Sequence, residues 1–323
     1  MKLLKRKEII FNPSQPFSFE KTFYNPSHFP SKMEKYSPEN RTYYIPLTWN
    51  KKIFGIKFSQ YGKAIKVSIY SNKNILKKEL AEIISELDYR FSITKKYKEF
   101  YKKYSTYKFL KSIIKRNRGK HISTNYSLYH HLIVSIFLQN TTIKRTIAMC
   151  EAVLRKYGQR IFFDNIELMS LWDLNAFHAS ENDLRNLKLG YRAKSIIRVT
   201  NLFLEMNLND LSLRKLETKD LVKELLKIYG VGKQTVFYLA LSQFQRTEYL
   251  KHIPLWERKV ISRYVFNKEL VDENKIIEWF QYKYEIWCGY ALSLIWEDIF
   301  HRHKKKPFPW LVKIMKEKID VKN

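Results

Sequence analysis

The chain has 323 residues, enough for one large or two ordinary domains with a sizeable core. Its 60 Lys and Arg residues against 31 Asp and Glu residues give a formal net charge of +29. This excess argues for a polyanionic partner, with a generally soluble basic protein as the alternative. The only cysteines, Cys150 and Cys288, exclude a disulfide framework, a four-cysteine iron–sulfur site and a cysteine-based zinc site.

The sequence also bears on location. The N-terminus, MKLLKRKEIIFNP, carries charge but no apolar run of signal-peptide length, and the apolar run at residues 132–138 is too short to span a bilayer. We therefore expect no secretion and no membrane partner. Two widely separated cysteines fit a reducing compartment. We expect a monomer in the cytoplasm or nucleoid, or in the nucleus of a eukaryote.

Residues before about position 74 indicate a small antiparallel sheet. Short β-like runs, separated by Asn, Ser, Pro and Gly, occur at residues 17–23, 42–46, 52–58 and 63–71. Residues 76–87 have helical periodicity, and we expect this helix to pack on the sheet. The later chain reads as helical, with candidate helices that include residues 143–157, 166–172, 255–266 and 275–302. The prediction is an α+β fold, with a sheet-plus-helix domain over residues 1–87 and an all-helical domain over residues 88–323.

Residues 217–236, ETKDLVKELLKIYGVGKQTV, indicate a helix, a tight turn and a second helix. Apolar residues recur at helical spacing before the turn, and Thr218 is the expected N-cap. Two glycines flank one valine at residues 230–232, where glycine permits positive φ. The second helix begins at Lys233. Free N–H groups at its start make an anion site, for which DNA phosphate is the obvious ligand of a basic protein.

Four segments, in the right order, resemble helix-hairpin-helix DNA glycosylases of the HhH-GPD superfamily. Residues 132–158 resemble the opening helices of the family, and LKLGYRAKSIIRV (187–199) resembles the LGxGYRAxYI segment of its 8-oxoguanine branch. GVGKQTVFYLAL (230–241) resembles the signature hairpin, and CGYALSLIW (288–296) resembles the helix that lines the base pocket. A small N-terminal sheet lobe is also typical of the 8-oxoguanine and 3-methyladenine glycosylases. The resemblance implies a base-excision repair enzyme that binds double-stranded DNA, flips one damaged base and breaks its N-glycosidic bond.

The resemblance assigns DNA contacts to two loops. Gln139 and Asn140 fall at the minor-groove wedge; alternatively they cap the helix that begins near residue 143. Tyr191, Arg192 and Lys194 fall near the lesion strand; alternatively, Arg192 and Lys194 are a solvated helix start.

The hairpin receives two assignments from the same resemblance, against the alternative of a plain tight turn. Backbone phosphate contacts are implied for Gly230, Val231, Gly232, Lys233 and Thr235. A monovalent cation bound by main-chain carbonyls is implied at Leu226, Ile228 and Val231. No other cofactor is expected.

The chemistry departs from the family pattern. Where the family reads roughly PVDxHVxRVxxR, this chain reads KHIPLWERKVISR (251–263). Aligning Val260 and Arg263 with the family pattern puts Pro254 at the position of the catalytic aspartate, and a shift by two puts Trp256 there instead. Glu248 and Glu257 are the local carboxylates. Glu257 is the candidate catalytic group; alternatively, it is a first-turn glutamate favoured by the helix dipole. Gln234 replaces the lysine that forms a Schiff base in bifunctional members, so we expect hydrolysis without lyase activity.

The implied base pocket also departs from the 8-oxoguanine branch. Leu292 replaces a base-reading glutamine, Trp296 replaces a stacking phenylalanine, Tyr238 would form the opposite wall, and Trp256 would lie near the mouth. Such an aromatic pocket suits electron-poor alkylated purines; alternatively, these are ordinary core residues. Two other functions stay open, a catalytically inactive relative that binds damaged or bent DNA and a structural DNA-binding protein.

Two basic clusters lie outside these motifs, KRNRGK at residues 115–120 and HRHKKK at residues 301–306. Either can contact phosphate, or the second can be a solvated helix end. The histidine pairs at residues 130–131 and at 301 and 303 lack a third ligand at sensible spacing, so we expect no metal there.

Overall fold

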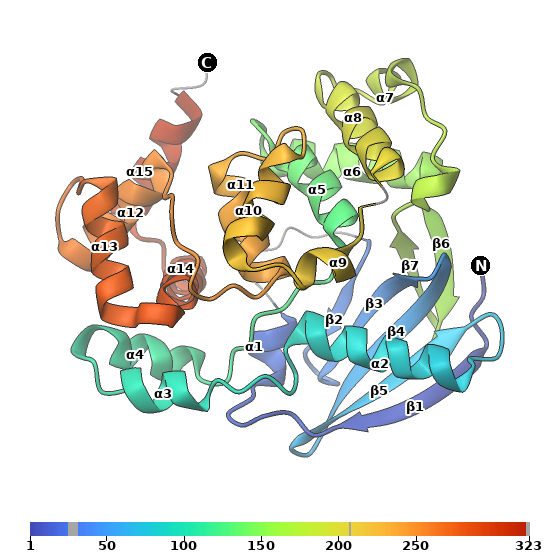
Figure 1. Cartoon of the computed structure of the whole chain (residues 1–323), viewed down its shortest axis with the longest axis horizontal. Coiled ribbons are helices and arrows are strands. Elements are labelled where there is room, and N and C mark those ends of the chain that lie inside the picture. Colours follow the sequence, from blue (N-terminus) through green and yellow to red (C-terminus); the bar gives the residue numbers. More distant parts are fainter. Residues whose placement is uncertain (25–31, 207, 321–323) are drawn as a thin grey trace. The chain divides into compact units, whose positions relative to one another are not determined.

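The computed structural model describes residues 1–24, 32–206 and 208–320 (Figure 1). The chain forms two compact units. Unit 1 comprises Met1–Tyr97 and Gly119–Asp210, and unit 2 comprises Lys98–Arg118 and Leu211–Asn323. The predicted domain division at residue 87 stays a prediction. Within the described residues, no helix is both long and apolar enough to cross a membrane.

An antiparallel sheet of five strands occupies unit 1 in the described part of the chain, in the order β1-β5-β4-β3-β2. The predicted sheet is therefore confirmed, although β1 and β2 were not anticipated. The strands are β1 (Lys5–Phe11), β2 (Lys35–Ser37), β3 (Thr42–Trp49), β4 (Lys52–Tyr61) and β5 (Ala64–Ser71). The prediction of a strand over residues 17–23 was wrong. Ser18 caps a short helix there, α1 (Phe19–Phe23), by accepting a hydrogen bond from the Lys21 N–H at 3.4 Å.

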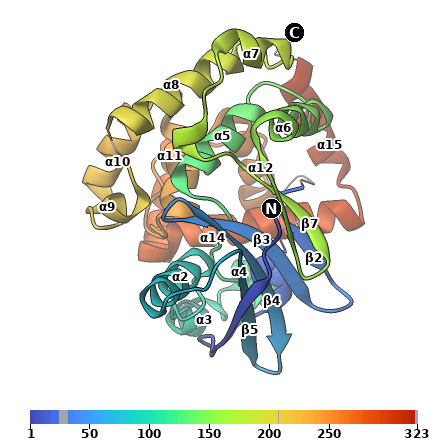
Figure 2. The same ribbon diagram turned by 90° about the vertical axis from the view of Figure 1, so that its right-hand side faces the viewer.

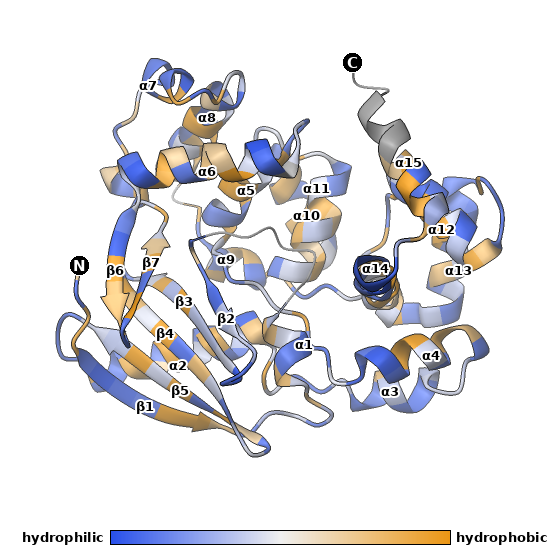
Figure 3. Cartoon of the chain, turned by 180° about the vertical axis from the view of Figure 1, so that it is seen from behind, coloured by the Kyte–Doolittle hydropathy of each residue, from blue (hydrophilic) through white to orange (hydrophobic). Residues whose placement is uncertain are grey.

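The two faces of the sheet bury different partners. Residues of β3, β4 and β5 on one face, such as Ile45, Ile56 and Ile69, share a core with α2 (Lys77–Phe91), the helix predicted over residues 76–87. Strand residues of the other face, such as Tyr44 and Tyr70, share a second core. Because side chains alternate along a strand, the sequence pattern has a period of two, and Figure 3 shows this as changing blue and orange bands along the strands.

A two-stranded hairpin, β6 (Gln159–Phe163) and β7 (Ile166–Ser170), contributes to the second core. The prediction of a helix over residues 166–172 was therefore wrong. The two turn residues, Asp164 and Asn165, have positive φ, which closes a tight hairpin. The prediction considered only the apolar residues after this turn, which are compatible with a helix. Figure 2 shows β7 close to strand β3 of the sheet.

Gly55 of β4 explains how closely this hairpin approaches the sheet. A Cβ atom at Gly55 would lie 2.5 Å from the ring of Phe163, which is too close for any side chain. The Asp164 carboxylate accepts hydrogen bonds from the hydroxyls of Tyr44 at 3.1 Å and Tyr70 at 2.7 Å, and pairs with Lys57 at 2.7 Å.

Helices make up the rest of unit 1. They are α5 (Leu128–Leu138), α6 (Ile143–Tyr157), η1 (Leu174–Ala176), α7 (Glu181–Asn186) and α8 (Arg192–Glu205), and α9 (Asp210–Arg214) begins at the last residue of the unit. Helix α6 has the predicted bounds, because the Thr142 side chain caps its start and Gly158 ends it.

Unit 2 is helical throughout its described part. Its elements are α3 (Lys98–Tyr104), α4 (Lys108–Asn117), α10 (Thr218–Lys227), α11 (Lys233–Tyr238), the π-helical turn η2 (Leu239–Gln243), α12 (Leu255–Phe266), α13 (Glu273–Tyr284), η3 (Glu285–Trp287), α14 (Cys288–Lys305) and α15 (Pro309–Asp320). Helix α12 has the predicted bounds. The predicted single helix over residues 275–302 was wrong: Glu285, with φ of +49°, ends α13, and a 3-10 turn precedes α14.

Candidate functional site

The predicted helix-hairpin-helix is present in unit 2. Helix α10 ends at Lys227. The N–H of its C-cap, Ile228, donates to the carbonyl of Leu225, and the Val231 N–H donates to the carbonyl of Ile228 at 3.0 Å. Val231 is buried, as expected for a residue between two helices. Helix α11 starts with the bond from the Val236 N–H to the Gly232 carbonyl at 3.0 Å.

The two turn glycines differ in their conformation. Gly230 has φ of +79°, the left-handed region that favours glycine, whereas Gly232 is extended with φ of −95°. Thr218 is not the N-cap of α10, contrary to the prediction. The cap is Glu217, without a side-chain hydrogen bond, and Thr218 is the first residue of the helix, with its hydroxyl donating to Glu248 at 2.5 Å.

The carbonyls suggested for a monovalent cation lie at the end of α10 and in the turn. The last carbonyls of a helix lack intrahelical partners, which suits Leu226 and Ile228 as oxygen ligands. The Ile228 carbonyl already accepts the Val231 N–H, which leaves it one further lone pair. The residues present are therefore compatible with such an ion.

Glu257 lies in the first turn of α12, and its side chain points inward. The residue is 1% exposed. Its Oε1 accepts a hydrogen bond from the Tyr238 hydroxyl and another from Gln234 Nε2 at 3.4 Å. Gln234 and Tyr238 are four residues apart on α11 and thus share one helix face. The structure therefore brings the candidate carboxylate to the helix that follows the hairpin turn.

Tyr238 is well suited to remain the donor in this pair. Burial of the hydroxyl, and then the negative charge of Glu257, hold the pKa of Tyr238 well above its usual value. The residue as a whole keeps 39% of its surface exposed. Its ring edge thus reaches solvent, while its hydroxyl end contacts the buried carboxylate.

Aromatic side chains of α12 and α14 form a ladder. The rings of Trp256 and Trp296 lie 5.5 Å apart at 45°, and Trp296 stacks on Phe300 at 5.5 Å and 21°. All three residues are half-buried. The Trp296 Nε1 is buried, with no hydrogen-bond partner among the described residues. Leu292, one turn earlier on α14, is fully buried.

The remaining predicted residues form a second group, in unit 1. Gln139 is the C-cap of α5, and Asn140 has φ of +45°. Neither caps α6, because the Thr142 side chain accepts the Arg145 N–H there. The Asn140 Nδ2 donates to the Tyr191 hydroxyl at 3.4 Å. The two loops assigned separately to DNA are thus in direct contact.

Arg192 joins these loops. It is 4% exposed, so it is not a solvated helix start. Its Nη2 donates to the carbonyls of Gln139 and, at 3.3 Å, of Asn140. Its guanidinium also lies 4.7 Å from the centre of the Tyr191 ring. Lys194, in contrast, is exposed.

Within residues 1–24, 32–206 and 208–320, no group of three or more His, Cys, Asp or Glu side chains could hold a metal ion. His130 is a structural residue: burial and then the charge of Arg90 lower its pKa to about 4.

Solved structures share the fold of this chain. The sequence matches no protein-family model and no curated protein. The 3-methyladenine DNA glycosylase of Archaeoglobus fulgidus matches with a TM-score of 0.74 at 14% identity, over 91% of this chain and 99% of its own. The Clostridium acetobutylicum 8-oxoguanine glycosylase/lyase matches with a TM-score of 0.69 at 19% identity, over 91% of this chain and 98% of its own. This chain has the DNA glycosylase fold.

The comparisons confirm the predicted α+β fold class and show that the chain shares the fold of the DNA glycosylases it was expected to resemble. The Clostridium enzyme was also solved with double-stranded DNA containing cytosine opposite 8-oxoguanine, and that structure matches with a TM-score of 0.68 at 19% identity, over 94% of this chain and 100% of its own. Sequence reasoning named Glu257 but missed the bracing contacts of Arg192, because hydrogen bonds between loops leave no local pattern.

Proposed function

We propose that this protein is a base-excision repair glycosylase that flips a damaged base from double-stranded DNA and hydrolyses its N-glycosidic bond. The observation that carries the proposal is the buried Glu257 carboxylate, which accepts hydrogen bonds from two residues of the helix after the hairpin turn. The shared fold and the net charge of +29 support a DNA partner.

Glu257 would supply negative charge where the sugar becomes positive. Loss of the base leaves an oxocarbenium-like sugar, which a fixed carboxylate stabilises in a water-poor site. The same carboxylate can accept a proton from the attacking water. Tyr238, whose raised pKa keeps it protonated, and Gln234 would hold the carboxylate in place as neutral donors.

The product would be an abasic site in an intact strand. The Gln234 amide is not a nucleophile and cannot form a Schiff base with the sugar. Water is therefore the attacking group in this proposal, and strand cleavage does not follow base release.

An alkylated purine is the proposed substrate. Alkylation at a ring nitrogen leaves the base electron-poor and often cationic, and such a base gains from stacking and cation–π contacts. Trp256, Trp296 and Phe300 offer such an aromatic surface. The Leu292 side chain has no hydrogen-bonding group with which to recognise the edge of an oxidised base.

The DNA contacts remain those suggested by the resemblance. The hairpin residues Gly230 to Lys233 and Thr235 would bind backbone phosphate, with the cation at the turn carbonyls. Gln139 and Asn140 would fill the space left by the flipped base, with Tyr191 and Lys194 near the lesion strand. In this proposal Arg192 shapes the wedge loop, since its guanidinium donates to that loop's carbonyls. We propose that the protein acts as a monomer.

The test is base release from duplex oligonucleotides that carry a single alkylpurine or a single 8-oxoguanine, with an undamaged duplex as the control. Hot alkali converts abasic sites to strand breaks, and omission of alkali reveals lyase activity. We expect alkali-dependent breaks at the alkylpurine, and a loss of roughly 10²–10³-fold in the single-turnover rate for Glu257→Gln. Glu248→Gln, which changes an exposed glutamate of the same unit, should keep the rate.

Pro254 favours a second candidate function. It stands where the family has its aspartate, and it is the N-cap of α12. An inactive relative that binds damaged or bent DNA would release no base from any lesion, yet would bind lesion duplexes more tightly than intact ones. That pair of results would replace the enzyme proposal.

A further inference from the structure

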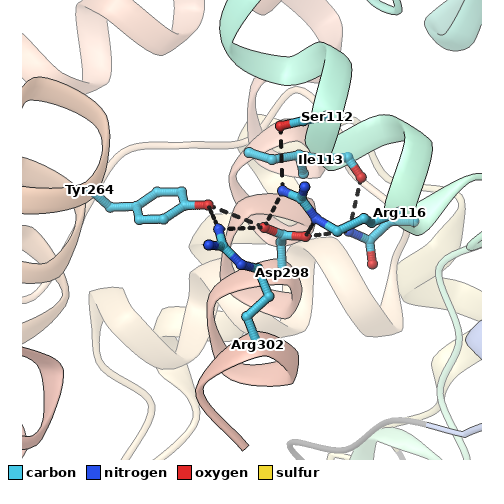
Figure 4. Close-up of polar contacts among 7 residues, drawn as sticks. Ser112, Ile113, Arg116, Tyr264, Asp298 and Arg302 are labelled. Atoms are coloured by element: carbon cyan, nitrogen blue, oxygen red, sulfur yellow. Dashed lines mark hydrogen bonds and ion pairs between the residues drawn. The ribbon is translucent and has the colours of Figure 1, made fainter. Parts of the chain in front are cut away.

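Asp298 of α14 lies at the centre of a polar cluster in unit 2 (Figure 4). The Arg116 guanidinium of α4 forms a bidentate pair with it, in which Nε donates to Oδ1 at 2.6 Å and Nη2 donates to Oδ2 at 2.8 Å. The Tyr264 hydroxyl of α12 donates to Oδ2 at 3.1 Å, and Arg302 Nη1 donates to the Tyr264 oxygen at 3.0 Å. None of these residues belongs to the hairpin.

The cluster joins the two basic segments of the sequence. Arg116 comes from KRNRGK and Arg302 from HRHKKK, and both lie next to the Asp298 carboxylate. Arg116 and Asp298 are 182 positions apart in the sequence. Asp298 is 2% exposed at its side chain, whereas Arg116 and Arg302 are each 42% exposed. The carboxylate is thus shielded from solvent, and both guanidiniums remain accessible.

An open cleft of about 610 Å³ lies over the cluster. Three cations line it: Lys108, Arg116 and Arg302. The other lining residues are Phe109, Ser112, Ile113 and Tyr264. Asp298, the acidic residue of the cluster, is buried and is not among the residues that line the cleft.

The charges of the cleft do not balance. The buried Asp298 requires a partner, and the bidentate Arg116 provides it, because an uncompensated buried charge is strongly destabilising. Arg302 and Lys108 then add two positive charges to the same cleft. Like charges that share a cleft repel each other and raise the local concentration of anions.

We propose that this cleft binds a phosphodiester segment of the nucleic-acid backbone, as a contact additional to the hairpin. Guanidinium groups match the oxygens of a phosphate, and a lysine adds a point charge. Asp298 would pre-order the guanidiniums through Arg116 and Tyr264. The cleft is larger than one phosphate requires, which suits a sugar-phosphate segment. That the anion is nucleic acid rests on the proposed function; that the cleft binds an anion does not.

The test measures affinity for an undamaged duplex over a range of salt concentrations, so it requires no base release. Arg302→Gln combined with Lys108→Ser leaves the Arg116–Asp298 pair intact. We expect its affinity to fall roughly 3- to 10-fold and the slope of log K against log salt to decrease by about 0.9 for each phosphate that the variant no longer neutralises. Arg302→Lys alone, which keeps the charge, should retain most of the slope.

The matched control is Arg263→Gln combined with Lys268→Ser. Both residues are exposed in unit 2 and lie outside the cleft lining, and the double variant loses the same charge. Equal slopes for the two double variants would overturn the proposal. If the cleft variant does not fold, as judged by its unfolding midpoint, Lys108→Ser alone at this exposed position gives the same comparison with Lys268→Ser.

Inorganic phosphate distinguishes the source of the anion. If phosphate at constant ionic strength raises the melting temperature of the wild type but not of the cleft variant, while both bind duplex equally, the site takes free phosphate and the backbone proposal is wrong. A protein that releases no base from any lesion, yet shows the expected loss of slope, would refute the proposed function and leave this inference standing.

Discussion

The hydroxyl of Tyr238 donates a hydrogen bond to the buried carboxylate of Glu257, linking the helix after the hairpin turn to the first turn of α12. This contact places a neutral donor, with a strongly raised pKa, against the only carboxylate proposed for catalysis. A buried carboxylate needs such donors, because loss of one partner leaves an acceptor without its compensating bond.

Tyr238→Phe should therefore destabilise the protein. We expect the free energy of unfolding to fall by about 1.5–3 kcal/mol, the usual contribution of a hydrogen bond to a charged group, with the bond from Gln234 Nε2 retained. Urea unfolding measures it. Tyr282→Phe, at a residue that is 81% exposed, provides the control and should change little. An equal effect of the two substitutions would show that the Tyr238–Glu257 bond contributes nothing.

The two turn glycines should respond differently to alanine. Gly230→Ala forces a side chain into left-handed backbone, at a cost of about 1–2 kcal/mol, and should weaken binding to duplexes of every sequence alike. Gly232→Ala should be nearly neutral for unfolding, since Gly232 is extended and no atom lies within 4 Å of a Cβ built there. Urea unfolding and duplex titrations test both. Sequence-selective loss of binding would contradict a backbone contact.

Arg192 should act through the wedge loop. Arg192→Lys keeps the charge but loses the planar fork that reaches the carbonyls of Gln139 and Asn140. We expect slower base release, and we expect its effect to be non-additive with that of Asn140→Ala, with a coupling of roughly 0.5–3 kcal/mol as for residues in contact. The double-mutant cycle is measured by single-turnover kinetics. Lys194→Gln, at an exposed position of the same helix, should show no coupling to Asn140→Ala.

His130 should make stability depend on acidic pH. Its folded-state pKa of about 4 lies below the ordinary value of 6.5, so the unfolded chain takes up a proton first as pH falls. The stability from this group is complete above about pH 6.5 and is lost progressively toward pH 4, by roughly 3 kcal/mol at 1.36 kcal/mol per pH unit. The free energy of unfolding between pH 7 and pH 4 tests this. His130→Gln should flatten that part of the profile; an unchanged profile would assign the loss to other groups.

Sequence reasoning reached furthest where local patterns were strong. Helices α6 and α12 had the predicted bounds because caps and periodic apolar residues coincide there. It failed at β6 and β7, where a short apolar run is compatible with a helix or a strand and the sheet partner is remote. It also failed at residues 17–23, where the Ser18 cap outweighed the β propensity of phenylalanine.

By itself, the sequence determined the basic charge, the hairpin with its glycine turn, and the presence of glutamine at position 234 and proline at position 254. These follow from residue identity and spacing. Only the tertiary structure decided that Glu257 turns inward to Tyr238, that Arg192 braces Gln139 and Asn140, and that Asp298 unites Arg116 with Arg302. The bonds from Tyr238 to Glu257, from Arg192 to Gln139 and from Arg116 to Asp298 each join different helices or loops, and such a contact is set by the packing of those elements rather than by any local pattern.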